Sequence, residues 1–317
     1  MKSRTKLLLL ASAALAALAC AACGGSQEIE TADTAALVAA PAAQLLAPEP
    51  EAPATARRVF TPVVAPGEGL EPAEEAINEK NEKQRYEIDI AFPQLKGRVS
   101  PNAAKFNRAV RELAEREAHD FKRADNDSKD RHPSGDRAWG EARDTLAGRY
   151  EVIHLDDDFV SLRFGFFAYG RGAAHPTQFH RVLSFDLRSG RALDLEDLFR
   201  PGAQHLRALA AHSIADLKRR DEEEHRREVA RVTAEGRPAS YAGVRTPDSD
   251  FQSGAGPEAE NYRAWNLAAE GVVVTFAACQ VFGCAAGEQE VLVPFSALAE
   301  ILNEHGPAAR LNAPQPR

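Results

Sequence analysis

The sequence is poor in the residues and motifs that mark most recognisable reaction centres. It has one methionine, two tryptophans and four cysteines in 317 residues, and aromatic residues make up only 7% of it. It contains no Gly-x-Ser-x-Gly nucleophile turn, no glycine-rich phosphate loop and no His-Glu-x-x-His pair. We therefore expect neither a catalytic constellation nor a bound cofactor.

The chain also lacks an excess of positive charge. Its formal net charge is −8, and residues 24–84 alone hold 11 acidic and 4 basic residues. The rest of the chain after residue 84 is close to balanced, so no basic surface for a nucleic acid is predicted.

The first 22 residues predict an exported lipoprotein. Three basic residues precede an apolar run, Leu7 to Ala19, which is too short to span a bilayer comfortably. The letters "CAACGGS" follow. Cys23 has an alanine at both preceding positions and a Gly-Gly-Ser tether behind it, so we expect it to be lipidated, with Cys20 as the alternative.

This pattern predicts a protein that reaches the membrane through a lipid anchor. Gly24 follows the favoured cysteine, and this favours the periplasmic face of the outer membrane. The alternative is an ordinary secretory signal cut after an Ala-x-Ala sequence, which predicts an exported protein as well.

Composition divides the mature chain into four predicted parts. Residues 23–84 are rich in Ala, Pro and Glu, with seven of the 19 prolines between Pro41 and Pro72, and this predicts a disordered tether. We expect a small N-terminal α/β subdomain over 85–150 and a C-terminal α+β domain over 151–305. Residues 306–317 are predicted to be a flexible tail.

Hydrophobic periodicity predicts the fold class. The stretch "RYEIDIAF" alternates apolar and polar residues, as a half-buried strand does. The stretch "SPNAAKFNRAVRELAEREAHDF" instead repeats apolar residues every three or four positions, which predicts a helix capped by Ser100. Strands and helices do not alternate regularly, so we expect an α+β fold: a mixed or antiparallel sheet with packed helices, preceded by the tether.

Two segments leave alternatives open. Residues 236–262 resemble a long loop, which fits a binding or lid segment and a tolerated surface insertion equally well. Cys279 and Cys284 form an even pair in an exported chain, which favours a disulfide. A metal site is the alternative for this pair, but no further cysteine or histidine lies within twenty residues.

The stretch "YGRGAAHPTQFH" holds the candidate ligand-binding residues. His175 and His180 are five residues apart, which places them on opposite faces of a strand, and Pro176 prevents a helix between them. A shared metal is therefore not expected. His175 is predicted to lie at a rigid corner between two strands, with either a structural or a ligand-facing role. The ligand-binding candidates are Tyr169, Gly172, His175, Pro176 and His180.

These residues also carry a resemblance to a known family. "GAAHP" followed by "FDLRSGRALDLEDLF", and the later "WNLAAEGVVVTF" and "EQEVLVPFSAL", resemble a bacterial exported domain of unknown function. That domain is shared by the ectodomain of a lysozyme-sensing anti-sigma factor and the non-catalytic region of a peptidoglycan deacetylase. "YEIDIAFPQLKG" is similar to the small domain that precedes it. The resemblance implies an α+β binding module without an established catalytic residue, and the metal-binding His motif of the deacetylase is absent.

Three hypotheses for function follow. The leading one is a lipid-anchored, non-catalytic envelope protein that binds a cell-wall-related ligand such as peptidoglycan, or a lysozyme-like protein. The second is a peptidoglycan-modifying hydrolase that uses His175 as a general base. The third is a scaffold or assembly factor at the outer membrane.

Overall fold

The structure is a computed structural model that describes residues 58–67, 69–131, 143–171, 173 and 175–311, with the backbone alone for 125–131. These residues belong to one compact unit, Pro50–Arg317. The predicted signal peptide, both candidate lipidation cysteines and the first part of the predicted tether lie outside the described residues.

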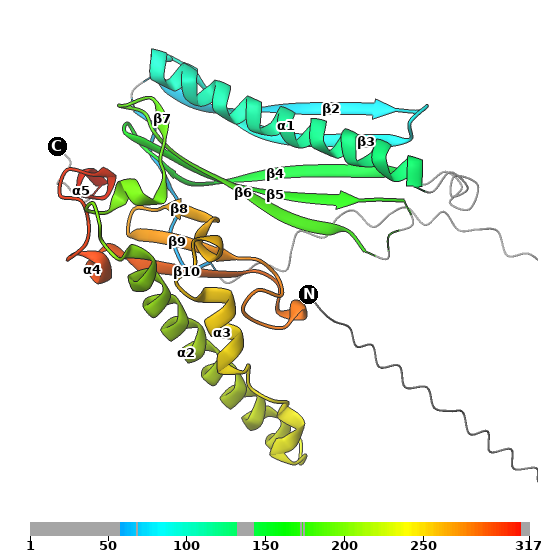
Figure 1. The fold of residues 1–317 in the computed structure, drawn as a ribbon, viewed down its shortest axis with the longest axis vertical. Helices are drawn as coiled ribbons and strands as arrows, with labels where there is room; N and C mark the ends of the chain where they lie inside the picture. The colour runs from blue at the N-terminus through cyan, green and yellow to red at the C-terminus, as the bar shows by residue number, and fades with distance from the viewer. Residues whose placement is uncertain (1–57, 68, 132–142, 172, 174, 312–317) are drawn as a thin grey trace, which may run out of the picture. The chain divides into compact units, whose positions relative to one another are not determined.

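The described strands form two sheets. The larger sheet runs β2-β3-β4-β5-β6-β7, with β1 beside β4, and the smaller runs β10-β9-β8 (Figure 1). Most neighbours are antiparallel, whereas β3 and β4, and β1 and β4, are parallel. The strands are β1 Val63–Val64, β2 Leu70–Asn81, β3 Tyr86–Gly97, β4 Asp144–Leu155, β5 Phe159–Tyr169, β6 Thr177–Asp186, β7 Arg191–Ala192, β8 Trp265–Leu267, β9 Gly271–Phe276 and β10 Gln289–Pro294.

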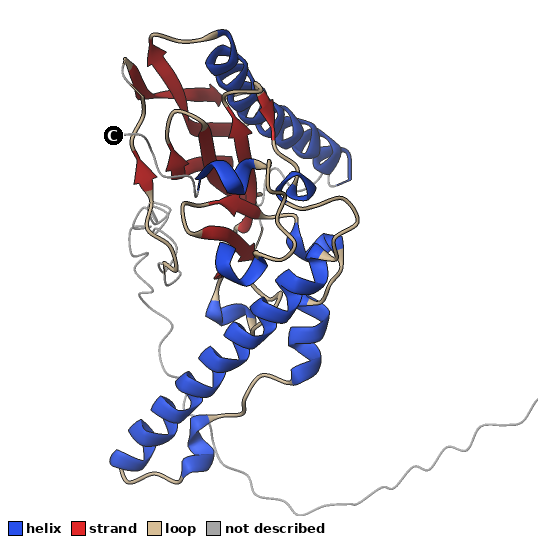
Figure 2. Ribbon diagram, turned by 90° about the vertical axis from the view of Figure 1, so that its left-hand side faces the viewer, coloured by secondary structure: helices blue, strands red, loops and turns tan. Residues whose placement is uncertain are grey.

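Helices flank the sheets, as Figure 2 shows. The α-helices are α1 Pro101–Arg131, α2 His205–Ala234, α3 Asp248–Ala255, α4 Phe295–Leu298 and α5 Pro307–Leu311. Short 3₁₀ helices are η2 Leu195–Leu198, η3 Ala239–Ala242, η4 Ala259–Tyr262 and η5 Cys284–Ala286. The predicted α+β class, with a mainly antiparallel sheet and packed helices, is confirmed. Within the described ranges, no helix combines the length and the apolar character needed to cross a membrane.

The elements stack as four layers: α1, the larger sheet, the smaller sheet, and α2 with α3 (Figure 1). One apolar core lies between α1 and the larger sheet, and a second lies between the smaller sheet and α2. Between the two sheets the apolar contact is small and centres on Ile153 and Val273. Polar side chains occupy much of the remaining space there.

Helix α1 begins as its sequence predicts. The Ser100 hydroxyl oxygen accepts a hydrogen bond from the backbone N–H of Ala103 at 3.1 Å, and Pro101 occupies the first helical position. Phe106 and Val110 are buried against the larger sheet because they lie on the same helical face. The helix continues past the predicted segment to Arg131.

The predicted tether extends too far. Residues 70–81 form β2, which pairs with β3 over twelve residues. The composition of this segment did not indicate a strand, because β2 is a polar edge strand. Two of its half-buried positions are glutamates that pair with basic residues. Glu75 pairs with Lys96 and Arg111, and Glu79 pairs with Lys122 at 2.9 Å.

Two other predicted boundaries are wrong. The division at residue 150 falls inside β4, which pairs with β5 on both sides of that position, so the larger sheet spans both predicted domains. The predicted tail contains α5, where Ala308 is fully buried against the second core. Residues 312–317 lie outside the described residues.

The segment 236–262 is not an irregular loop. It contains η3, α3 and η4, and it buries Phe251 and Tyr262 in the second core. The Tyr262 hydroxyl donates to the Ala255 carbonyl oxygen at 2.7 Å. Its C-terminal part is therefore a core element, and the interpretation as a lid or dispensable insertion does not apply to α3 and η4.

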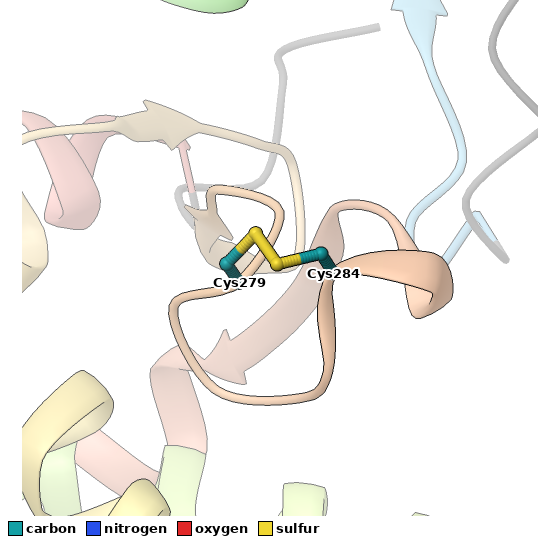
Figure 3. The surroundings of a disulfide bond; sticks show 2 residues. All are labelled: Cys279 and Cys284. Carbon is teal, nitrogen blue, oxygen red and sulfur yellow. A yellow bond between two sulfur atoms is a disulfide. The ribbon is translucent and has the colours of Figure 1, made fainter. Parts of the chain in front are cut away.

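The predicted disulfide is confirmed. Cys279 and Cys284 are joined within the loop between β9 and β10, with their Cα atoms 4.1 Å apart (Figure 3). The enclosed Val281 is buried, and the Gln280 side chain donates to the Gly254 carbonyl oxygen at 2.8 Å. The bond therefore closes a loop that packs on α3.

Candidate functional site

The His-Pro turn connects β5 to β6, as predicted, with Tyr169 at the end of β5. His175 is exposed, and its Nδ1 lies 3.2 Å from the carbonyl oxygen of the next residue, Pro176. Among the described residues, no other hydrogen bond or ion pair involves its ring. Gly172 lies outside the described residues.

An arginine inside the turn anchors it to the sheet. The Arg171 backbone N–H and Nε donate to the two carboxylate oxygens of Asp144 at 2.6 and 2.8 Å. Each side chain is only 9% exposed, so the ion pair through Nε and the hydrogen bond from the backbone N–H together fix the end of β5 to the start of β4. Sequence reasoning missed the pair because its partners are 27 residues apart and no local spacing signals the contact.

The structure separates the two candidate histidines. His180 lies within β6 opposite Gly165 of β5, on the face toward the smaller sheet. Its Nδ1 lies 2.7 Å from a carboxylate oxygen of Glu288, just before β10, and both side chains are mostly buried. A Cβ on Gly165 would stand 3.7 Å from His180 Nε2, so the ring lies directly over this glycine.

Burial and two nearby arginines, Arg163 and Arg181, lower the pKa of His180 to about 4. The imidazole is therefore neutral at neutral pH, and its Nδ1–H donates to Glu288. Burial also raises the pKa of the Glu288 carboxyl above its ordinary value. The contact between His180 and Glu288 is therefore a hydrogen bond from a neutral ring and not an ion pair.

Arg163 is the charged centre of the space between the sheets. It projects from β5 and is 14% exposed, and it pairs with Glu151 of β4 at 2.6 Å and with Glu290 of β10. Its Nη1 also donates to the Thr275 hydroxyl of β9 at 3.1 Å. Burial works against the charge, but the two glutamates hold the pKa of Arg163 above its ordinary value. One side chain therefore joins strands from both sheets.

Neutral polar groups continue this layer. Asn266 of β8 donates to the Ser161 hydroxyl at 3.0 Å and to the Leu162 carbonyl oxygen at 2.8 Å. The Ser184 hydroxyl accepts from the Leu267 backbone N–H and lies 3.1 Å from the Ser161 hydroxyl. These groups are all buried and come from both sheets, so they fix the position of the smaller sheet on the larger one.

The described residues do not offer a metal site. No group of three or more His, Cys, Asp or Glu side chains among them is placed to hold a metal ion. The inter-sheet layer joins charged and polar groups to one another and has no exposed nucleophile. Its arrangement is suited to holding the two sheets together.

Two families match this chain. Residues 79–178 match the family described as Deacetylase PdaC, and residues 196–296 match the protein family of unknown function DUF3298. The resemblance predicted from the sequence is thereby confirmed: a domain of unknown function occurs here together with a region shared with a peptidoglycan deacetylase.

Individual relatives are distant. Peptidoglycan-N-acetylmuramic acid deacetylase PdaC of Bacillus subtilis (strain 168) is 20% identical over 224 residues, which cover 71% of this chain and 40% of that protein. A crystal structure of a DUF3298 family member from Bacteroides fragilis NCTC 9343 is 16% identical and has a TM-score of 0.52, covering 78% of this chain and 99% of its own. A DUF3298 family protein of Pseudomonas aeruginosa PAO1 is 17% identical, with a TM-score of 0.44 and coverage of 74% and 94%.

These matches show which parts of the chain resemble known proteins. The Bacteroides structure shares the fold, and the chain spans less than half the length of the Bacillus enzyme. The match to DUF3298 begins at η2 and ends at the start of α4, so it includes α2, α3 and the smaller sheet.

We predict that Arg163→Met lowers the free energy of unfolding by about 3 to 5 kcal/mol, because it leaves the Glu290 carboxylate buried without its partner. Chemical denaturation of the purified protein measures the loss. The double variant Arg163→Met, Glu290→Leu removes both charges and should recover part of it. A double variant less stable than Arg163→Met would show that the ion pair is not the source of the loss.

The pKa of His180 also predicts a pH dependence. Between about pH 6.5 and about pH 4, the unfolded chain binds a proton at this residue that the folded chain does not bind, so its contribution to stability falls as the pH falls. The full difference is on the order of 3 kcal/mol.

We expect His180→Gln to lose less stability than the wild type when the pH is lowered through this range, as measured by urea denaturation at each pH. Since the raised pKa of Glu288 acts in the opposite direction, the comparison is repeated in a Glu288→Gln background. Parallel pH profiles for the two His180 forms in both backgrounds would contradict the assignment.

Proposed function

We propose that this protein is a lipid-anchored cell-envelope protein that binds a cell-wall-related ligand and has no catalytic activity of its own. The observation that carries the proposal is the pair of adjacent matches, residues 79–178 and 196–296, one of them to a peptidoglycan deacetylase family. The curated relative is named for action on peptidoglycan, and this supports the wall glycan as the ligand class.

The geometry at His175 argues against the hydrolase hypothesis. A histidine that acts as a general base is usually oriented by a second group, most often a carboxylate. His175 is exposed, and its ring nitrogen is paired with the adjacent main chain. The carboxylate of this region, Asp144, is instead occupied by Arg171.

The anchor is proposed from the residues before the described part of the chain. We expect Cys23 to carry the lipid, because its neighbours fit the pattern of lipoprotein processing better than those of Cys20. Metabolic labelling with a radioactive fatty acid should mark the wild type and Cys20→Ala but not Cys23→Ala. Label retained in Cys23→Ala and lost in Cys20→Ala would identify Cys20 as the lipidated residue. An unlabelled wild type would show that the protein carries no lipid anchor.

The wall-binding proposal is tested by sedimenting the full chain with purified insoluble peptidoglycan. We expect the wild type and His175→Ala to pellet equally and saturably at moderate salt, with no soluble sugar or acetate released. Loss of released product in His175→Ala with an unchanged melting temperature would favour the hydrolase hypothesis.

A calorimetric titration with lysozyme tests the other proposed ligand class, a lysozyme-like protein. Lysozyme is basic and residues 24–84 are acidic, so heat that fades with salt reports only charge attraction. Saturable one-to-one heat that survives moderate salt, with no pelleting on peptidoglycan, would identify a protein ligand and overturn the glycan proposal.

A further inference from the structure

A pocket of about 300 Å³ lies between α2 and the disulfide loop together with the residues that follow it. On the α2 side it is lined by Arg220, Asp221, Glu224 and Arg227, and on the other side by Phe282 and Gln289 among others. Positions 220, 224 and 227 share one helical face, so they form a continuous wall. The pocket is open to solvent on one side, and its volume is at the lower end of the range for small-molecule sites, which suits one sugar-sized group that remains partly exposed.

The α2 wall is fixed by Arg220. Its Nη2 donates to the Glu290 carbonyl oxygen of β10 at 2.6 Å and to a carboxylate oxygen of Asp216 at 2.5 Å. The side chain is 13% exposed, so this contact holds α2 to the smaller sheet beside the pocket. The backbone of this helical face is therefore held in place without a ligand, whereas the side chains of Glu224 and Arg227 remain exposed.

The opposite wall is fixed by the disulfide loop (Figure 3). The Phe282 ring lies within this loop and packs edge-on against Phe251 of α3, with the ring centres 5.5 Å apart. Gln289 is held by a hydrogen bond of 2.9 Å from its amide to the Ala286 carbonyl oxygen. An aromatic ring and an amide thus stand at defined positions across from the charged face of α2.

The lining groups favour an uncharged polar ligand. Two guanidinium groups and two carboxylates balance each other, so the pocket has no net charge with which to select a phosphate or a nucleic acid. Arg227 and Glu224 are 61% and 72% exposed and pair at 3.0 Å, a surface ion pair that contributes little and can exchange for ligand hydroxyls. Carboxylates accept from hydroxyls and guanidinium groups donate to them.

We propose that this pocket binds one N-acylated amino-sugar ring of a wall glycan strand. The apolar face of the sugar and its acyl methyl group lie against Phe282, and its hydroxyl and amide groups bond to Glu224, Arg227 and Gln289. This inference rests on the proposed wall-binding function and assigns it a site and a ligand class.

The test uses the full chain and peptide-free N-acetylated glycan oligosaccharides in calorimetric titrations. The variant Glu224→Ala, Arg227→Ala removes two exposed groups of the pocket and should weaken Kd at least tenfold. The matched control is Glu228→Ala, Arg231→Ala, which removes another ion pair of α2 outside the pocket lining. It should leave Kd unchanged. Thermal melting of each variant confirms that the fold is intact.

The possible results distinguish a wrong pocket assignment from a wrong proposed function. If wild type and pocket variant bind the glycan equally, the pocket assignment is wrong and the wall-binding function stands. If the wild type pellets with whole peptidoglycan but does not bind peptide-free glycan, the sugar assignment is wrong and a stem-peptide ligand is indicated. If the wild type binds neither, the proposed function fails and the pocket assignment fails with it.

Discussion

The arrangement of the two sheets depends on one buried guanidinium. Arg163 leaves the larger sheet and is held by Glu151 from the same sheet and by Glu290 from the smaller one. An unpaired charge in this position would cost several kcal/mol, and so would the buried Glu290 carboxylate alone. Glu151 is 25% exposed and also pairs with Arg58, so it depends less on Arg163. Apolar contact between the sheets is small, so the relative position of the sheets is fixed by groups that require specific partners at specific distances.

The same strand that completes this ion pair also fixes the far side of the molecule. Successive residues of a strand point to opposite faces, so Glu290 directs its side chain toward Arg163 while Val291 packs in the core under α2. The carbonyl oxygen of Glu290 accepts from Arg220 of α2. Strand β10 therefore connects the inter-sheet layer to α2 through one residue's carboxylate and carbonyl groups, and the α2 pocket is built on that connection.

The sequence predicted those parts of the structure in which local spacing decides the outcome. Apolar periodicity was sufficient for β3 and α1, and Ser100 marked the start of the helix correctly. Strand β2 was missed because a polar edge strand has the composition of a tether. The role of Arg163 could not be predicted, since Glu151 and Glu290 lie 12 residues before and 127 residues after it and only the three-dimensional fold brings them together. The His-Pro turn was located correctly, and the five-residue spacing of His175 and His180 already indicated that the two rings do not share a site. The anchoring contact of Arg171 does not follow from spacing.

Strand β2 also bears on self-association of the larger sheet. It ends the order of described strands in the larger sheet, so one side of its backbone has no strand partner among the described residues. Long exposed edges of this kind are templates for aggregation unless the sequence opposes it. Pro72 removes one backbone donor, and glutamates recur along the strand at Glu71, Glu74, Glu75 and Glu79. The polarity that gives β2 the composition of a tether is thus also the property that opposes pairing of this twelve-residue edge with a further strand.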